Sequence, residues 1–214
     1  FLNQIRSGGK VPPDLEVHFF TGELDLPDQL SKVFTQMMDD LLVLEGTGDR
    51  VDGDRPYEAF NILHGFNGTG PIRLDAVEVI SPYRGFYFGS DAFNAQLQTM
   101  LRGGLLASRN KKLGRPSGRQ FVSFDKILQA KNERGRASNR VAWVKARGYV
   151  DYFVANGELG KLVTVKYDTR GKGLYGKALF ETSPETWIRI NEGWAEGMLV
   201  LGYAISVHKA QGSD

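Results

Sequence analysis

The stretch Leu201–Asp214, LGYAISVHKAQGSD, decides between two architectures for this chain. It starts with small and apolar residues, continues through Ser206, His208 and Lys209, and ends in a Gln-Gly-Ser-Asp turn. The segments before it are short, β-rich and separated by turn residues, whereas Gly202–Ala210 is again compatible with a helix. We therefore expect an antiparallel β unit that is inserted into an α/β domain rather than appended to it.

The first part of the chain alternates strand and helix patterns. Apolar residues recur at spacings of three and four over Pro27–Leu44, which predicts an amphipathic helix. The predicted elements are, in order, a strand at Leu15–Phe20, this helix, a strand at Asp75–Ile80 and a helix at Ser90–Arg102 with Ser90 as its N-cap. Glu45–Gly70 carries six glycines and is predicted to be mostly connection. This order favours a parallel sheet of the α/β class.

The middle of the chain has a different pattern, typical of a small antiparallel barrel. Its predicted strands lie in Phe121–Ala130, Leu159–Tyr167, Leu174–Phe180 and Trp187–Asn191. We place the inserted unit at residues 118–198, between residues 14–117 and a return segment at 199–214.

Charge is divided very unevenly, although the formal net charge is only +2. Asp14–Leu101 contains fifteen Asp or Glu and five Lys or Arg, whereas Arg102–Arg147 contains thirteen Lys or Arg and only Asp125 and Glu133 as acids. A basic block of this density is typical of a surface that binds a polyanion, and nucleic acid is the commonest one. For Arg102–Arg119, a solvated loop is an equally good interpretation.

Composition also excludes several classes of site. The chain has no cysteine, which excludes disulfides, thiol catalysis and cysteine-based zinc sites and favours a cytoplasmic location. Apolar runs such as Met198–Val207 are far shorter than the ~20 residues of a membrane-spanning helix, so no membrane is implied. The three histidines, His18, His64 and His208, are too far apart in sequence for a recognisable metal motif.

Gly171–Lys177 (GKGLYGK) matches the spacing of a phosphate-binding loop but not its chemistry. The next residue is Ala178, where a magnesium-binding Ser or Thr belongs, and the surrounding pattern is that of a β-hairpin. We therefore expect no complete nucleotide triphosphatase site within this chain.

The polar residues near the end of the chain form a candidate binding group. Ser206, His208, Lys209 and Gln211 bring a hydroxyl, an imidazole, an ammonium and an amide together just before Gly212, where the backbone can turn tightly. Such a group can contact a phosphate backbone and a nucleotide at once. Capping of a helix end is the alternative interpretation.

Three stretches resemble the superfamily 1B DNA helicases of the RecD type. Gly202–Asp214 (GYAISVHKAQGSD) is similar to the late family motif Y-A-I-T-V-H-K-S-Q-G-S-E. Val77–Leu101 (VEVISPYRGFYFGSDAFNAQLQTML) resembles an earlier stretch with an I-S-P-x-R-x-G core followed by L-N-x-x-L-Q. Phe124–Asn132 (FDKILQAKN) and Val154–Val165 (VANGELGKLVTV) resemble the family segments D-K-V-M-Q-x-x-N-N and F-N-G-D-I-G-x-V, which shape an inserted SH3-like barrel.

The resemblance implies a RecA-like parallel sheet domain with an inserted small antiparallel SH3-like β-barrel. Residues 1–13 would be a stub from the first RecA-like domain, and residues 14–117 and 199–214 would form the second. The phosphate loop and the magnesium carboxylates would lie before Phe1, and the arginine finger after Asp214. The intact protein would then hydrolyse ATP with Mg²⁺, whereas this chain alone would bind neither and would be inactive.

The resemblance also implies roles for individual residues. The implied sites are Ser206, His208 and Lys209 for the phosphates of single-stranded DNA, and Gln211, Gly212 and Asp214 for the ATP cleft. Asp214 stands where the family usually has Glu, and Ser206 stands where it usually has Thr. Arg84 is a candidate phosphate contact, with a surface ion pair as the alternative.

The inserted unit carries a second candidate surface for nucleic acid. Its aromatic residues Trp143, Tyr149, Tyr152 and Phe153 are interspersed with Lys145 and Arg147, a composition typical of a base-stacking surface beside a charged groove. Packing within the unit is the alternative use of each ring.

Two other functions stay open on the sequence alone. One is a non-catalytic nucleic-acid-binding module, and the other is the helicase half of a relaxase or exonuclease assembly in recombination or DNA repair. The partners expected from the resemblance are single-stranded DNA, ATP and nuclease or repair-complex subunits.

Overall fold

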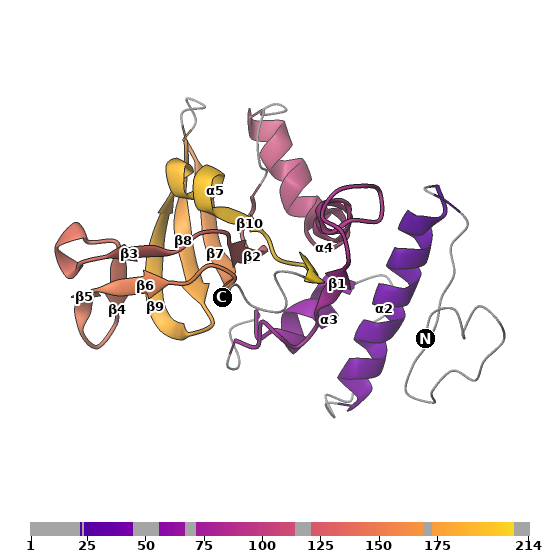
Figure 1. The fold of residues 1–214 in the computed structure, drawn as a ribbon, viewed down its shortest axis with the longest axis horizontal. Helices are drawn as coiled ribbons and strands as arrows, with labels where there is room; N and C mark the ends of the chain where they lie inside the picture. Colours follow the sequence, from indigo (N-terminus) through magenta and orange to yellow (C-terminus); the bar gives the residue numbers. More distant parts are fainter. Residues whose placement is uncertain are drawn as a thin grey trace.

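A computed structural model of the chain describes residues 22, 24–44, 56–66, 72–113, 121–168 and 173–207. Figure 1 shows two regions within these ranges: helices around a pair of parallel strands, and an antiparallel sheet beside them. The fold is therefore mixed α/β, as expected. None of the helices in the described ranges combines the length and the apolar character that a bilayer crossing requires.

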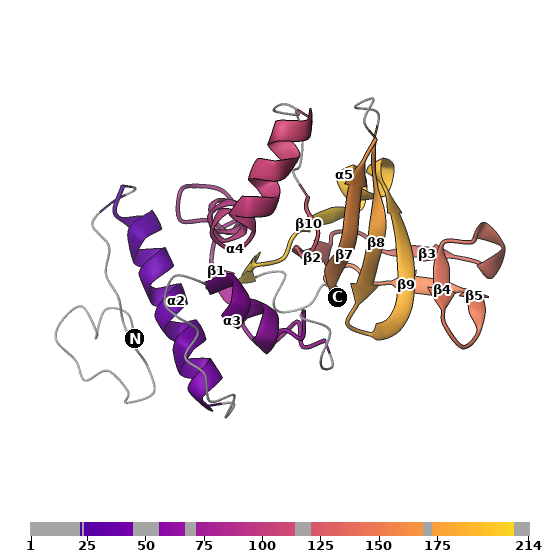
Figure 2. The ribbon, with the colours of Figure 1, turned by 180° about the vertical axis from the view of Figure 1, so that it is seen from behind.

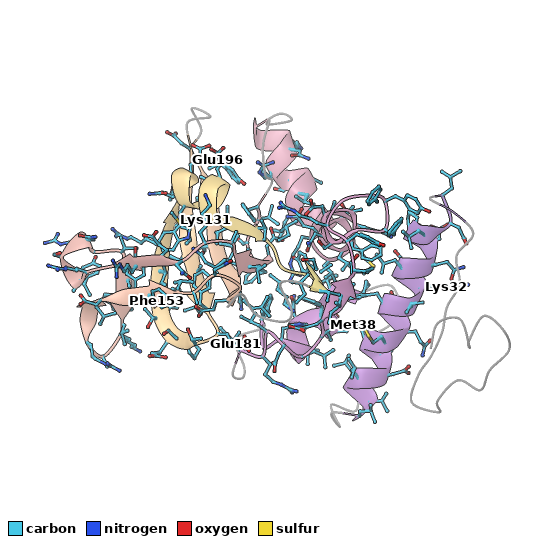
Figure 3. The ribbon with its side chains drawn as sticks, in the orientation of Figure 1. Lys32, Met38, Lys131, Phe153, Glu181 and Glu196 are labelled. Atoms are coloured by element: carbon cyan, nitrogen blue, oxygen red, sulfur yellow. The ribbon has the colours of Figure 1, made fainter. Side chains whose placement is uncertain are left out.

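Helix α2 (Leu26–Leu44) confirms the amphipathic pattern in the first part of the chain. Its side chains Phe34, Met38 and Leu42 are buried at a spacing of four residues, which places them on one face of the helix. In Figure 3, Met38 points from α2 toward α3, whereas the exposed Lys32 points away from the rest of the protein. The apolar face of α2 thus helps to build the core.

Helix α3 (Pro56–Leu63) lies in the region that the glycines predict to be mostly connection, so that prediction is wrong for these residues. Proline is favourable at the first helical position because it has no N–H to leave unpaired there. The helix buries Ala59, Phe60 and Leu63, whose spacing of one and three residues forms an apolar stripe.

Helix α4 (Ser90–Leu113) continues well past its predicted end at Arg102. The solvated-loop interpretation is therefore wrong for residues 102–113. Gly103 and Gly104 favour a helix end. No close packing requires a glycine at either position, since a Cβ there would meet nothing within 4 Å. The helix continues because tertiary contacts hold the turns that follow. The guanidinium of Arg109 lies 4.3 Å from the ring centroid of Tyr167, which anchors this part of the helix to the sheet.

Strands β1 (Val79–Ser81) and β11 (Ala204–Ser206) form a parallel pair with Val79 opposite Ala204. Strand β1 is shorter than predicted, and β11 lies in a segment that was expected to be compatible with a helix. That expectation is corrected for residues 204–206. The strand expected at Leu15–Phe20 lies outside the described residues.

The antiparallel region has a seven-stranded sheet and a separate two-stranded ribbon. The strands of the sheet, in spatial order, are β10 (Leu199–Leu201), β2 (Lys126–Gln129), β7 (Leu159–Tyr167), β8 (Leu174–Phe180), β9 (Ser183–Asn191), β4 (Ala142–Val144) and β5 (Gly148–Val150). The ribbon pairs β3 (Glu133–Gly135) with β6 (Tyr152–Val154). Short helices η1 (Ala137–Asn139) and α5 (Glu192–Met198) complete the region.

Several sequence predictions are confirmed in this region. Strands β7 and β8 have the predicted bounds, and β9 begins earlier than predicted. Strands β7 and β8 pair as an antiparallel hairpin, and Leu174–Lys177 of the GKGLYGK stretch lie on β8, so these residues form a strand and not a helix N-terminus. The hairpin confirms the reason for rejecting it as a phosphate-binding loop.

The chain enters the antiparallel region after β1 and α4 and leaves it just before β11. Strand β11 returns to pair with β1. The antiparallel strands are therefore inserted, in sequence, between the two strands of the parallel pair. Each region has its own apolar core: Phe34, Phe60 and Leu97 belong to the helical one, and Ile127, Leu162 and Ile188 to the other. The boundaries of the inserted unit at residues 118 and 198 stay predictions. Strand β10, which lies just after residue 198, pairs with β2 of the antiparallel sheet.

Candidate functional site

The two parallel strands end side by side. Ser81, the last residue of β1, is the register partner of Ser206, the last residue of β11. The loop after β1 is held in place by Ser81, whose hydroxyl donates to the carbonyl oxygen of Phe88 at 3.0 Å and accepts from the N–H of Tyr83 at 3.3 Å. Helix α4 begins directly after this loop. In open α/β sheets, ligands bind at this end of the strands.

A groove of about 620 Å³ lies at this position, between the helical region and the antiparallel sheet. The loop after β1 and the first turns of α4 form one wall, with Arg84, Ser90, Asp91 and Asn94 among the lining residues, and Lys131 lies on the antiparallel side. Ser206 also lines it, so this groove contains two of the predicted phosphate contacts, Arg84 and Ser206.

Arg84 is exposed and makes an ion pair with Asp91, with Nε 3.2 Å from Oδ2. This contact favours the ion-pair alternative for the free chain. Both side chains are more than half exposed, so the pair is worth only ~0–1 kcal/mol, and an anionic ligand can compete for the guanidinium.

The loop that carries Arg84 also exposes an aromatic cluster that the sequence analysis missed. Phe86 is 73% exposed and has a left-handed backbone with φ of 66°. Its ring stacks on Phe88 with a centroid distance of 5.7 Å, and Tyr83 meets both rings edge-on. The GFYFG sequence was the available signal, because three consecutive aromatic residues between glycines cannot all be buried in a short loop.

Two other predicted site residues, Lys145 and Arg147, are not brought into this groove. Lys145 and Arg147 lie in the turn between β4 and β5, and Figures 1 and 2 both show these strands at the end of the molecule away from β1 and β11. The other predicted contacts, His208, Lys209, Gln211, Gly212 and Asp214, lie outside the described residues, as does His18.

Asn94 fixes β11 beside the groove. Its side-chain Nδ2 donates to the carbonyl oxygen of Ala204 at 2.7 Å, and its Oδ1 accepts from the N–H of Ala204 at 2.9 Å. Both hydrogen bonds are buried, so α4 holds the backbone that leads into Ser206 in one register.

A second buried contact joins α4 to the start of the inserted strands. The carboxylate of Asp125 accepts hydrogen bonds from Gln98 at 2.7 Å, from the hydroxyl of Tyr203 at 2.8 Å and from the N–H of Val122 at 2.8 Å. Burial raises the pKa of Asp125 to about 6, and these three donors oppose the shift. One carboxylate thus ties together α4, the segment before β2 and the segment before β11.

Buried cations also join the helical region to the inserted strands. The ammonium of Lys126 donates to the carbonyl oxygen of Val77 at 2.8 Å. The ammonium of Lys161 donates to the carbonyl oxygen of Phe66 at 3.1 Å. Burial lowers the pKa of both ammonium groups to about 8. Arg102 is also buried and donates to Phe124 and Asn61. Arg102 and Lys126 therefore belong to the structural junction and not to a nucleic-acid surface, which corrects part of the interpretation of the basic block.

His64 is packed into the same junction. Its ring stacks on Phe60 at 3.9 Å between centroids, and its Nδ1 lies 2.9 Å from the carbonyl oxygen of Phe60. Burial, followed by the nearby charge of Lys126, lowers the pKa of His64 to about 3. Among the residues that the structure describes, no three His, Asp or Glu side chains are grouped so that they could hold a metal ion.

No protein-family model matches the chain, and no curated protein matches it.

Proposed function

We propose that this chain is the C-terminal part of an ATP-dependent DNA helicase or translocase of the RecD type. In this proposal the helical region with β1 and β11 is a second RecA-like domain, and the antiparallel region is an inserted SH3-like barrel. The chain contributes contacts to single-stranded DNA and one wall of an ATP cleft. A first RecA-like domain outside residues 1–214 supplies the phosphate loop and the magnesium ligands.

The observation that carries the proposal is the convergence of the stretches that resemble the family. Asn94 and Gln98 occupy the N and Q positions of L-N-x-x-L-Q, and Asp125 occupies the D of D-K-V-M-Q. Asn94 binds the backbone of Ala204 in the late motif, and Gln98 binds Asp125. Polar residues that are far apart in sequence thus hold the three stretches together, which supports reading them as parts of one family pattern.

The chemistry of the groove also supports the proposal. Ser206 offers a hydroxyl at the end of β11, and the chain continues from there to His208, Lys209 and Gln211. Across the groove, Arg84 offers a guanidinium that is held only by an exposed ion pair. Hydroxyl, imidazole and guanidinium groups are donors that suit phosphate oxygens. In the proposed motor, Gln211, Gly212 and Asp214 face the nucleotide.

The test is an ATPase assay on the chain extended at both ends, with and without single-stranded DNA. The proposal requires ATP hydrolysis that single-stranded DNA stimulates. The variant His208→Ala should lower the stimulated rate more than the basal rate, because the imidazole contacts DNA and not ATP. An extended protein without ATPase activity would contradict the motor, and an equal loss of both rates would contradict the role of His208.

A non-catalytic nucleic-acid-binding module is the second candidate. The position of Lys145 and Arg147, exposed on the antiparallel region and away from the groove, favours it. The same assay separates the two candidates, because a binding module binds single strands without hydrolysing ATP.

A further inference from the structure

The outer face of the seven-stranded sheet carries a row of aromatic side chains. Trp143 on β4 is the register partner of Tyr149 on β5 and of Trp187 on β9, so the three rings lie on one face of neighbouring strands. Trp143 is 40% exposed and Tyr149 is 41% exposed. Large aromatic side chains at this level of exposure on adjacent strands are uncommon unless they bind something.

The opposite face of these strands packs against the core. Ala142 and Val144, which flank Trp143, are buried, and so is Ile188, which follows Trp187. The β3–β6 ribbon and α5 cover this inner face, where Tyr152 stacks on Trp194 at 5.7 Å. Figure 2 shows β7, β8 and β9 from the side opposite the ribbon. The aromatic row is therefore a surface feature and not unfinished core packing.

Positive charge surrounds the row. The ammonium of Lys177 on β8 lies 5.0 Å from the ring centroid of Trp187, and Arg189 is the register partner of Lys177. Lys145 and Arg147 are exposed in the turn that joins Trp143 to Tyr149. These are four cations around three rings.

Negative charge is scarce on the same strands. Strands β4, β5, β8 and β9 contain one acidic residue, Glu185, which is exposed two positions before Trp187. The face therefore favours a partner that is anionic and that offers flat rings. A single-stranded nucleic acid has both properties, whereas an acidic peptide has only the first.

We propose that Trp143, Tyr149 and Trp187, with Lys145, Arg147, Lys177 and Arg189, form a binding surface for single-stranded nucleic acid that is separate from the groove at β11. This goes beyond the proposed motor site, since the surface works whether or not the chain belongs to a helicase. Strands lie ~4.8 Å apart, so the row from β5 to β8 spans about 14 Å. That length suits about four nucleotides at a rise of ~3.4 Å, with bases on the rings and phosphates along the cations.

The first test measures binding of a fluorescein-labelled oligothymidylate of about twelve nucleotides to residues 1–214 by fluorescence anisotropy. Trp143→Ala should weaken binding at least fivefold, and Trp143→Phe should restore most of it, because one stacked base contributes that much. Phe153→Ala is the matched control, since Phe153 is 57% exposed but lies on the β3–β6 ribbon, which covers the opposite face of the sheet and not the aromatic row. An equal effect of Phe153→Ala and Trp143→Ala would overturn the proposal.

The second test measures the salt dependence of the same binding and does not require changes within a strand. Four phosphate contacts predict a slope of about −2.8 in log affinity against log salt, which is roughly a 50-fold loss between 50 and 200 mM salt. The double variant Lys145→Ala/Arg147→Ala should reduce the slope to about −1.4. An unchanged slope would overturn the assignment.

A third arm separates nucleic acid from an acidic protein partner. A fluorescein-labelled polyglutamate peptide of similar length should bind more weakly than the oligonucleotide and should be insensitive to Trp143→Ala. Peptide binding that equals oligonucleotide binding and depends on Trp143 would refute the nucleic-acid assignment. None of these outcomes depends on ATP hydrolysis, so failure here and failure of the motor proposal are distinguishable.

Discussion

Asn94 in α4 holds the backbone of Ala204 in β11 through both ends of its amide, at 2.7 and 2.9 Å, although the two residues are 110 positions apart in sequence. One side chain therefore satisfies both polar groups of a buried residue in a strand that is only three residues long. The position of Ser206, and of the tail that follows it, depends on this contact.

Removing the amide should destabilise the protein. We expect Asn94→Ala to lower the free energy of unfolding by about 2 kcal/mol or more, because the N–H and the carbonyl oxygen of Ala204 are left buried without these partners. Thr99→Ala is the control on the same helix, since Thr99 is exposed and its hydroxyl donates to the carbonyl oxygen of Ala95 one turn earlier. Urea denaturation of both variants measures the difference, and equal midpoints would contradict the role of Asn94.

Gly202 is required by the close approach of two backbones. A Cβ at this position would lie 2.7 Å from the carbonyl carbon and 2.8 Å from the carbonyl oxygen of Ile127. We expect Gly202→Ala to cost about 3 kcal/mol, since neither backbone can move without breaking the hydrogen bond from Gly202 N–H to Lys126. Gly197→Ala in α5 should be neutral or slightly stabilising, because a Cβ there meets nothing within 4 Å. Thermal unfolding of the two variants checks this contrast.

His64 should make the protein sensitive to acid. Its pKa of about 3 in the folded state lies below the value of 6.5 in the unfolded chain, so only the unfolded state binds a proton between these values. The contribution of neutral His64 to the free energy of unfolding is therefore fully present above pH 6.5. It decreases as the pH falls, by about 2 kcal/mol at pH 5.

The variant His64→Phe removes this titration. Between pH 7 and pH 5, we expect the unfolding free energy of the unmodified protein to fall by about 2 kcal/mol relative to that of His64→Phe. Asp125 titrates in the opposite sense in both proteins, so its contribution cancels in the difference. A pH-independent difference would show that the pKa of His64 is the same in the folded and unfolded states and would contradict this prediction.

Tyr203→Phe should have an effect that depends on the ionisation of Asp125. The hydroxyl of Tyr203 donates to Asp125 at 2.8 Å, and the carboxyl has a pKa of about 6. At pH 8 the loss leaves a buried carboxylate with one donor fewer, at a cost of about 1–3 kcal/mol. At pH 5, where the carboxyl is largely protonated, the cost should be smaller. Tyr83→Phe, on an exposed loop, should show no such pH dependence in urea denaturation.

Asp91 should restrain Arg84 in the groove. Asp91→Asn removes the partner of Arg84, so oligonucleotide binding to the chain should strengthen, and the slope against log salt should steepen by about 0.7. Asp40→Asn makes the same charge change on α2, away from the groove, and should have less effect. Equal effects of the two variants in fluorescence anisotropy would show that only net charge matters.

The sequence predicted the parts of the fold whose patterns are local. The period of α2 follows from side-chain spacing, and β7 and β8 follow from their β-rich composition between turn residues. All three elements were predicted within one residue. Helix α3 was missed because glycines on both sides dominate the pattern. The second half of α4 was missed because Gly103 and Gly104 resemble a helix end, whereas a contact with Tyr167 holds the turns that follow.

The candidate site was predictable only in part. Ser206 and Arg84 could be singled out from motif positions, and both line the groove. The buried charges could not, because a sequence gives no measure of burial: Lys126 and Arg102 read as part of a basic surface, yet each is held inside by backbone carbonyl oxygens. The aromatic row could not be predicted as one surface, because it depends on the register of β4, β5 and β9.

The placement of β11 beside β1 has a consequence for the folding pathway. The β7–β8 and β8–β9 ladders join segments that are close in sequence, whereas the β1–β11 pair closes a much longer loop at a higher entropic cost. Contact order of this kind slows folding, so the parallel pair is expected to dock last, after the inserted strands have collapsed and brought its ends together. During synthesis, β1 and α4 would wait without their neighbour until the ribosome has released β11.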